Sequence, residues 1–388
     1  MTRPAANPFR PTFGVSPRVL AGRRDVLEEF ALALAEGPGS PQRAMLVSGA
    51  RGMGKTVLLN ELEDAARSQG WVVVRARPHE AMIRDLVDTD IPLAMRSLDQ
   101  AGPAATGRPT RRVTGIEVAG LGAVHTATDP GTAPTPTVFS ALRDLGVLTA
   151  RHGAGVLITL DEAQAADPEH LHLLSTAIQD LARDELDIAF AAAGLPHGID
   201  ELLRAPGTTF LRRAERVTLG RVSPEEAADA FSRTAGEGGL PMSPPAARLA
   251  ARRSEGYPYL MQLLGSMAWA RARLDGDERI DEEHLDAVHD RAVDRLGKQV
   301  HEPALGEATD RELELLIAMA RLSLDAGGGP VATGDLAAAL GTKPNGISMA
   351  RRSLLDKELL VAPSYGHLDF ALPYLAEFLD RSPGLGDR

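Results

Sequence analysis

Residues 44–56 read AMLVSGARGMGKT, an apolar run followed by a glycine-rich segment that ends in lysine and threonine. The last eight of these residues, 49–56, match the pattern G-x-x-x-x-G-K-[ST]. Glycines let the backbone curl so that successive amide groups face one anion, and a following helix adds the positive end of its dipole. The stretch therefore predicts a buried strand, a phosphate-binding loop and a helix that runs to about residue 69.

The loop pattern also assigns chemistry to its residues. Lys55 is expected to place its positive charge on the β- and γ-phosphates of ATP, and the Thr56 hydroxyl is expected to ligate Mg²⁺. Only four of the 42 basic residues are lysine, so a lysine at this position has a chemical reason. The residues predicted to bind the nucleotide are Gly49, Ala50, Arg51, Gly52, Met53, Gly54, Lys55, Thr56 and Val57.

A pair of carboxylates follows a second apolar run, VLITL at 156–160. Ligands bind where parallel strands end, so Asp161 is a candidate for the Mg²⁺ shell and Glu162 for the general base that polarises water. A solvated strand end is the alternative interpretation. Because kinases must exclude water, the glutamate beside the aspartate favours hydrolysis, with Lys55 and Glu162 as the predicted catalytic residues.

The elements around these motifs predict an α/β fold with a parallel sheet. Apolar strands are expected at 71–76, 187–193 and 215–219, and helices at 23–35, 138–151 and 168–183. From residue 223 the pattern is helical throughout. We therefore divide the chain into a P-loop core over 1–222, an all-α lid over 223–300 and a third unit over 301–388. The core begins with a proline-rich extended lead-in and carries an insertion at about 100–137.

The third unit has the pattern of a winged helix-turn-helix. Helices are expected near 309–323, 333–340 and 345–358, followed by a strand–turn–strand at 359–371. Arginine can read guanine edges and asparagine adenine edges in a major groove of double-stranded DNA. The candidate DNA contacts are Lys343, Asn345, Ser348, Arg351 and Arg352.

Charge keeps a second interpretation of this unit open. Residues 301–388 contain 8 basic and 13 acidic residues, although 341–357 hold four basic residues and one acidic residue. A winged helix that binds protein is therefore the alternative.

A hairpin predicted at 113–127, with Arg108, Arg111 and Arg112 beside it, is a further candidate DNA contact, and a plain surface loop is its alternative.

Composition excludes several classes of protein. The chain has 388 residues, a net charge of −11 and no cysteine, so we expect no disulfides, no Cys-ligated zinc and no iron–sulfur cluster. A non-specific nucleic-acid coat protein is disfavoured by the negative charge. No apolar run is long enough to cross a bilayer and the first residues lack a signal-peptide pattern, so we expect a cytoplasmic protein without a membrane partner.

Together, the motifs resemble AAA+ and STAND-type P-loop ATPases, most closely the branch near archaeal origin-recognition initiators with a C-terminal winged helix. The resemblance covers about residues 15–380 and includes the phosphate loop, the DEAQ segment at 161–164, the strand that ends in AAGLP at 192–196, and GYPYL at 256–260. It implies that residues 20–24, LAGRR, border the adenine.

Two departures from that family pattern bear on turnover. The strand end at 191–194 reads AAAG, without the expected polar sensor, and the helix from residue 258 lacks a second sensor arginine. Gln164 is a candidate replacement for the first. The resemblance also implies a trans-acting arginine, for which Arg212, Arg213 and Arg216 are candidates, with ordinary surface arginines as the alternative.

The leading hypothesis is an ATP-dependent switch that couples nucleotide state to DNA through the winged helix, with slow or partner-stimulated hydrolysis of ATP to ADP and phosphate. The alternatives are a STAND-like signalling ATPase whose C-terminal unit binds protein, and a nucleotide-binding module with negligible turnover. A homo-oligomer or a protein partner is consistent with the trans-acting arginine.

Overall fold

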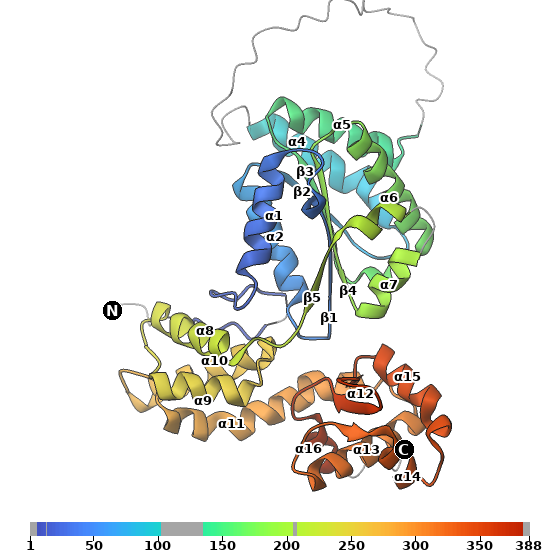
Figure 1. Ribbon diagram of the computed structural model, residues 1–388. Helices are drawn as coiled ribbons and strands as arrows, with labels where there is room; N and C mark the ends of the chain where they lie inside the picture. The colour runs from blue at the N-terminus through green and yellow to red at the C-terminus, as the bar shows by residue number, and fades with distance from the viewer. Residues whose placement is uncertain (1–5, 13, 102–134, 205–207, 383–388) are drawn as a thin grey trace, which may run out of the picture.

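The computed structural model describes residues 6–12, 14–101, 135–204 and 208–382. Its centre is a parallel five-stranded sheet in the order β2-β3-β4-β1-β5 (Figure 1). The P-loop NTPase fold expected from the sequence is confirmed. The strands are β1 (Ala44–Gly49), β2 (Val72–Ala76), β3 (Val156–Leu160), β4 (Ile188–Gly194) and β5 (Glu215–Leu219).

The strands are apolar on both faces because helices cover both faces. Successive side chains of a strand alternate between faces, so Met45 and Val47 contact one core while Leu46 contacts the other. Helices α1 (Arg24–Glu36) and α2 (Lys55–Ser68) cover the first face. The second face carries α3 (Met82–Asp85), α4 (Ile91–Ala101), α5 (Val138–Arg151), α6 (Pro168–Arg183) and α7 (Pro196–Arg204).

Four helices follow the last strand and form the lid. They are α8 (Pro224–Glu237), α9 (Pro244–Ser254), α10 (Pro258–Asp275) and α11 (Glu282–Leu296). The side chains of Ser223 and Ser243 accept hydrogen bonds from backbone amides in the first turns of α8 and α9, and a proline follows each serine at the first helical position. The lid lies at the edge of the sheet where β1 ends (Figure 1).

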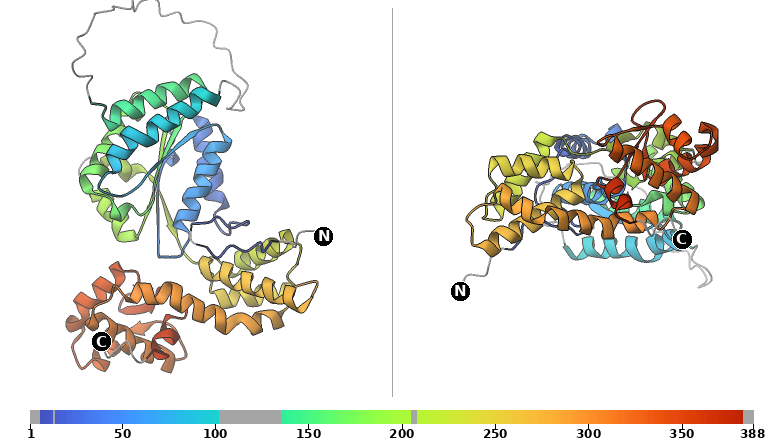
Figure 2. Two further views of the ribbon diagram at one scale, coloured as in Figure 1. Left: turned by 180° about the vertical axis from the view of Figure 1, so that it is seen from behind. Right: turned by 90° about the horizontal axis from the view of Figure 1, so that it is seen from below.

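The winged-helix domain, from α13 to α16, lies at the same edge (Figure 2). Helix α11 leads into it through a π-helical turn at 297–301 and α12 (Glu302–Leu305). Three helices, a three-stranded sheet in the order β6-β8-β7 and a final helix make up the domain. Its elements are α13 (Asp310–Asp325), β6 (Val331–Ala332), α14 (Thr333–Ala339), α15 (Ser348–Asp356), β7 (Leu360–Val361), β8 (His367–Phe370) and α16 (Leu375–Asp380).

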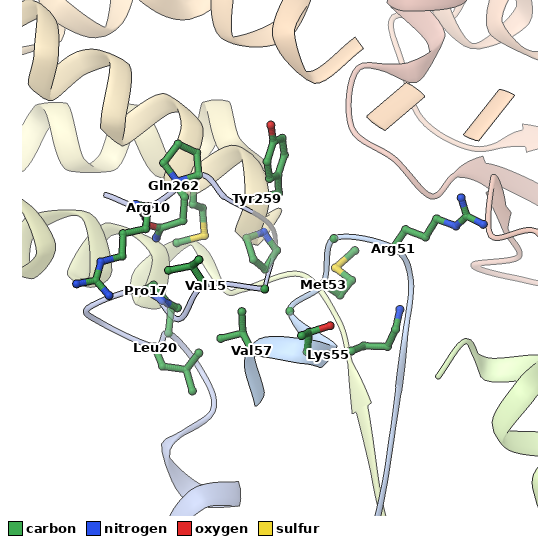
Figure 3. Close-up of a pocket in the computed structure, with 18 of the residues that line it drawn as sticks. Arg10, Val15, Pro17, Leu20, Arg51, Met53, Lys55, Val57, Tyr259 and Gln262 are labelled. Atoms are coloured by element: carbon green, nitrogen blue, oxygen red, sulfur yellow. Dashed lines mark hydrogen bonds between the residues drawn. The ribbon is translucent and has the colours of Figure 1, made fainter. Parts of the chain in front are cut away.

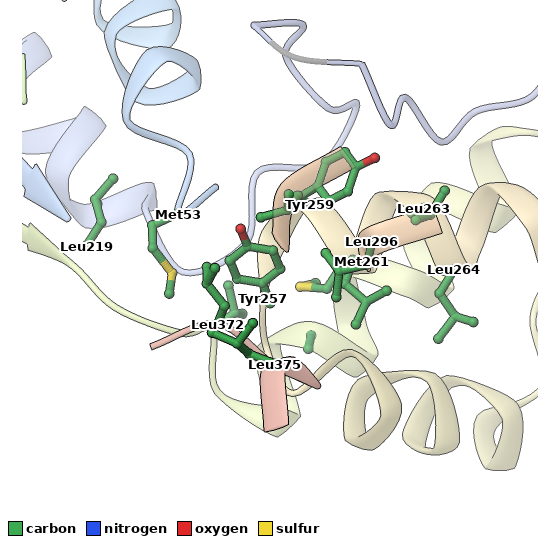
Figure 4. Close-up of a cluster of buried hydrophobic side chains, with 14 of the residues drawn as sticks. Met53, Leu219, Tyr257, Tyr259, Met261, Leu263, Leu264, Leu296, Leu372 and Leu375 are labelled. Atoms are coloured by element: carbon green, nitrogen blue, oxygen red, sulfur yellow. The ribbon is translucent and has the colours of Figure 1, made fainter. Parts of the chain in front are cut away.

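The lid and the winged-helix domain share a hydrophobic core. Leu372 and Leu375 pack beside Tyr257 at the start of α10 (Figure 4). The Tyr374 hydroxyl donates a hydrogen bond to the Arg253 carbonyl at 2.8 Å, and the buried His301 ring lies 3.0 Å from the Pro373 carbonyl. The domain is therefore packed on the lid.

Some elements differ from the sequence expectations. The single helix expected over 345–358 is a 3-10 turn, Pro344–Ile347, followed by the shorter α15, because Pro344 begins the turn and Gly346 follows close behind.

The hairpin at 113–127 and Arg108, Arg111 and Arg112 lie outside the described residues. Within the described part of the chain, no helix is both long and apolar enough to cross a membrane.

Candidate functional site

The phosphate loop, residues 49–56, connects β1 to α2 in a tight curl. Gly52 and Gly54 adopt left-handed φ angles of 77° and 89°, which favour glycine. A Cβ at Gly52 would come within 1.9 Å of the Tyr257 hydroxyl oxygen, so no other residue fits there. That hydroxyl donates a hydrogen bond to the Arg51 carbonyl at 2.9 Å, which ties the loop to the lid.

Lys55 lies at the first turn of α2 with its side chain almost entirely buried. Its Nζ donates to the carbonyls of Gly49 and Ala50 at 2.7 and 3.2 Å. Burial lowers the pKa of Lys55, and the neighbouring carboxylates, Glu358 first, oppose that shift. The side chain thus lies inside the curl of the loop.

Thr56 and Asp161 meet across the sheet edge, 105 positions apart in the chain. The Thr56 hydroxyl donates to Asp161 Oδ2 at 2.6 Å, and the other carboxylate oxygen of Asp161 accepts from the Glu162 amide at 2.9 Å. A hydroxyl and a carboxylate side by side are the oxygen ligands that Mg²⁺ takes in nucleotide sites. The donor set fits that ion.

Glu162 turns away from the strand with a left-handed φ of 50°. Its exposed carboxylate accepts a short hydrogen bond from the Gln164 side-chain amide, whose oxygen accepts from the Leu195 amide at 3.1 Å. Gln164 therefore links Glu162 to the end of β4. This is the strand end that offers only AAAG in the sequence.

A cavity of about 530 Å³ opens beside the loop (Figure 3). Its polar end is formed by Lys55, Thr56 and Glu162, and its other wall is largely apolar. Residues 20, 21 and 23 of the expected adenine border line it. The apolar wall consists of Val15, Pro17, Val19, Leu20, Ala21, Val57, Val222 and Met261.

Sequence reasoning missed part of this wall. Arg10, Val15 and Pro17 come from the lead-in, and Tyr259 and Gln262 come from α10 (Figure 3). Met261 of α10 also lines the cavity. The Arg10 amide donates to the Gln262 side-chain oxygen at 3.0 Å, so the two segments meet. The prolines of the lead-in predict an extended conformation, but no local sequence signal predicts that this segment lies against the lid.

The candidate trans-acting arginines lie at the far end of the sheet. Arg212 and Arg213 end a 3-10 turn before β5. Arg216 lies in β5 itself, where it is in register with Leu46 of β1. All three are exposed. Because β5 runs parallel to β1, Arg212 and Arg213 precede the strand and do not lie at the phosphate loop of their own chain.

The candidate DNA contacts share one side of the winged-helix domain. Lys343, Asn345, Ser348 and Arg352 are exposed, whereas Arg351 is half-buried and its Nε finds no hydrogen-bond partner in the part of the chain that the structure describes. Lys357, which contributed to the local positive charge, is bound to the Glu312 carboxylate at 2.6 Å. The free positive charge on this side is therefore smaller than the sequence count indicates.

Comparisons with known proteins agree with this architecture. Residues 19–190 match the family model of an AAA ATPase domain, and residues 298–379 match a domain of unknown function, DUF8462. No protein with curated annotation matches the chain in sequence.

Two solved structures cover nearly the whole chain. The ORC2 protein of Aeropyrum pernix, in its ADPNP–ADP complexes, is 18% identical with a TM-score of 0.62 and 96% coverage of both chains. A Walker-type ATPase of Pyrococcus abyssi is 17% identical with a TM-score of 0.61, covering 93% of this chain and 96% of its own. At these identities the likeness is one of fold.

Proposed function

We propose that the chain, whose residues 19–190 match the model of an AAA ATPase domain, binds ATP with Mg²⁺ in the cavity beside the phosphate loop and hydrolyses it slowly. The observation that carries the proposal is that Lys55 and Thr56 lie together at the polar end of the cavity, where the Thr56 hydroxyl is hydrogen-bonded to Asp161, while the other wall is largely apolar. The apolar wall suits a purine ring and the polar end suits the phosphates.

The residues of the loop would hold the phosphates through their backbone amides and the Lys55 ammonium. Thr56 and Asp161 would hold Mg²⁺, which supplies charge stabilisation to the phosphates when bound. Glu162, exposed at the rim, would accept a proton from the attacking water. Gln164 would orient Glu162 from the end of β4 and so replace the polar residue that this strand lacks.

Turnover of Lys55→Ala and Glu162→Gln tests the catalytic assignment. Both variants are expected to lose ATPase activity, and Glu162→Gln is expected to keep ATP binding because the amide has the shape of the carboxylate. Unchanged phosphate release in either variant would show the assignment to be wrong. The assay is repeated with DNA and over a range of protein concentrations.

The concentration series also tests the trans-acting arginine. If Arg212, Arg213 or Arg216 completes the site of a second copy, specific activity rises with protein concentration and an alanine at the responsible position removes the rise. Strict proportionality between rate and concentration would exclude a trans-acting residue. In the cell, a second copy of the chain or a protein partner would supply the trans-acting arginine. We expect the protein to be cytoplasmic.

We further propose that the winged-helix domain reports nucleotide state to double-stranded DNA. The exposed side chains of Lys343, Asn345, Ser348 and Arg352 support this, with Arg351 half-buried behind them. Salt-titrated binding of wild type and Lys343→Ala/Arg352→Ala provides the test, with Arg321→Ala on α13 as control. For each phosphate contact that is lost, the slope of log K for DNA binding against log salt concentration should become smaller by about one.

A second candidate function has its own support. The side chains of Met349 on α15 and Tyr365 at the wing tip are 83% and 104% exposed, and the domain is acidic overall. Exposed apolar and aromatic side chains beside few free cations suit a protein partner better than a phosphate backbone. If DNA binding of wild type equals that of Lys343→Ala/Arg352→Ala, the signalling ATPase with a protein partner is favoured.

A nucleotide-binding module with negligible turnover is the third candidate. The buried apolar end of β4, at Ala191, Ala192 and Ala193, supports it because these side chains cannot contact a phosphate. Tight ATP binding without phosphate release, both alone and with DNA, would select this candidate.

A further inference from the structure

One carboxylate of the winged-helix domain lies against the phosphate loop. Glu358 follows α15 with a left-handed φ of 56°, and only 7% of its surface is exposed. Neither carboxylate oxygen has a hydrogen-bond partner among the described residues. A non-glycine residue at such a φ and an unpaired buried carboxylate each cost free energy, so the surrounding packing must hold Glu358 in place.

The groups around Glu358 belong to the nucleotide site. Burial raises the pKa of Glu358 to about 7, and the Lys55 ammonium, the Arg51 amide and the Arg51 guanidinium oppose the rise, while Glu162 adds to it. The Arg51 amide is close enough to lower this pKa, but its geometry falls short of a hydrogen bond. Glu358 thus places a carboxyl group against a loop that is built to bind anions.

The same loop has a second contact with the polypeptide that leads into this domain. The Arg51 guanidinium extends from the loop, away from the cavity wall (Figure 3), and both oxygens of the Glu307 carboxylate lie 2.9–3.0 Å from its Nη2. Glu307 lies between α12 and α13. Arg51 is therefore in contact with the C-terminal region through its side chain and, at Glu358, through its backbone.

We propose that Glu358 and the terminal phosphate of ATP compete for the phosphate loop, so that binding of the triphosphate displaces Glu358 and moves the winged-helix domain. This rests on the proposed function. The groups that Glu358 faces, Lys55 and the Arg51 amide, are of the kind that bind phosphate oxygens, and two anions at one loop repel. ADP lacks the terminal phosphate and is expected to compete less.

Movement of Glu358 would be transmitted to α15 directly. Only Lys357 separates Glu358 from the last residue of the helix, and Lys357 is anchored to Glu312 of α13 at 2.6 Å. Displacing Glu358 from the loop therefore shifts α13 and α15 together. The side of the domain that carries Lys343 and Arg352 would change its position relative to the core.

The first test compares nucleotide affinities of wild type and Glu358→Gly, which removes the side chain and suits the left-handed φ. A second variant, Glu358→Asn, keeps a polar group and also tolerates this φ. Both should bind a non-hydrolysable ATP analogue with Mg²⁺ about tenfold more tightly than wild type, while their ADP affinity changes by less than about twofold.

The matched control is Glu314→Gln, at an exposed position of α13, which should leave both affinities unchanged. Equal gains for the analogue and for ADP, or no gain for either, would overturn the competition. If wild type and all variants bind no nucleotide, the proposed function itself fails, so the two failures are distinguishable.

The second test measures movement. The chain has no cysteine, so Leu32→Cys on α1 and Tyr365→Cys on the wing, both exposed, place two fluorophores without competing thiols. Energy transfer between them should change with the ATP analogue and not with ADP, and half of the change should occur at about tenfold lower analogue concentration in Glu358→Gly. Unchanged transfer at saturating analogue would overturn the displacement.

Discussion

Two regions of the molecule bring a glutamate towards Lys55, and they treat it differently. At the end of β3, Glu162 is exposed and hydrogen-bonded to Gln164. After α15, Glu358 is buried and its carboxylate accepts no hydrogen bond from the described residues, and burial raises its pKa to about 7. Both have left-handed φ angles, 50° and 56°.

Solvent and a hydrogen bond therefore stabilise the ionised form of Glu162, whereas burial without a hydrogen bond destabilises the ionised form of Glu358. A supported anion can accept protons repeatedly, as a general base must. An unsupported anion is readily displaced, because water or a better-placed partner stabilises it elsewhere. The comparison therefore predicts that Glu162 acts in the chemistry and Glu358 acts in regulation.

The largest expected effect concerns Glu162. Glu162→Gln should reduce kcat by about 10²–10⁴-fold, the usual contribution of a general base, while ATP affinity stays within about threefold of wild type. Glu185→Gln is the control, since Glu185 also has a left-handed φ, 57°, and is exposed away from the cavity. Equal losses in both variants would point to a backbone effect and would remove the distinction.

The pH dependence of stability distinguishes Glu358 from an ordinary glutamate. Below about pH 4.5 the group is neutral in both the folded and the unfolded chain; as the pH rises towards 7, ionisation favours the unfolded chain. Wild type should therefore lose up to about 3 kcal/mol of unfolding free energy relative to Glu358→Gln between pH 4.5 and 7, with no further change above.

Urea unfolding of the two proteins at several pH values measures this difference. A wild type that gains stability relative to Glu358→Gln as the pH rises would mean that the Lys55 attraction exceeds the cost of burial. In that case Glu358 would be a supported anion like Glu162, and the comparison would fail.

A smaller effect is expected at Gln164, which joins Glu162 to the Leu195 amide. Gln164→Ala should lower kcat about tenfold by removing one orienting hydrogen bond, with little change in KM. Gln164→Glu should be at least as harmful because two carboxylates would then face each other. A Gln164→Ala enzyme with wild-type kcat would show that Glu162 needs no support.

The smallest effect is expected at the surface pair of Arg51 and Glu307, whose side chains are 40% and 50% exposed. Glu307→Gln should cost less than about 1 kcal/mol of stability, since solvent and salt screen exposed pairs. Thermal unfolding at low and high salt checks this. A cost above about 2 kcal/mol would mean that this pair, rather than Glu358, dominates the contact with the phosphate loop.

The parts of the fold and site that were predictable depend on local sequence. The loop at 49–56 forms its own curl, so Lys55 and Thr56 could be placed from the pattern alone, and the apolar run before Asp161 located the second half of the site. Helices with clear caps, such as α5 and α6, were predicted with the bounds that the structure has.

The parts that were not predictable depend on distant contacts. Glu358 reaches a loop about 300 positions earlier in the chain, and its neighbours in sequence give no sign of that contact. The wall formed by Val15 and Pro17 requires the lead-in to lie against α10. The two-residue strand β6 exists through its pairing with β8, about 35 positions later, and Val331 and Ala332 are too few to carry a strand pattern of their own.

The most direct test of the account is calorimetric titration of wild type and Lys55→Ala with a non-hydrolysable ATP analogue and Mg²⁺. We predict saturable binding of one analogue per chain, weakened about a hundredfold in Lys55→Ala by loss of the charged contact to the phosphates. Absence of saturable binding to wild type at millimolar analogue, or equal affinity in the two proteins, would contradict the account.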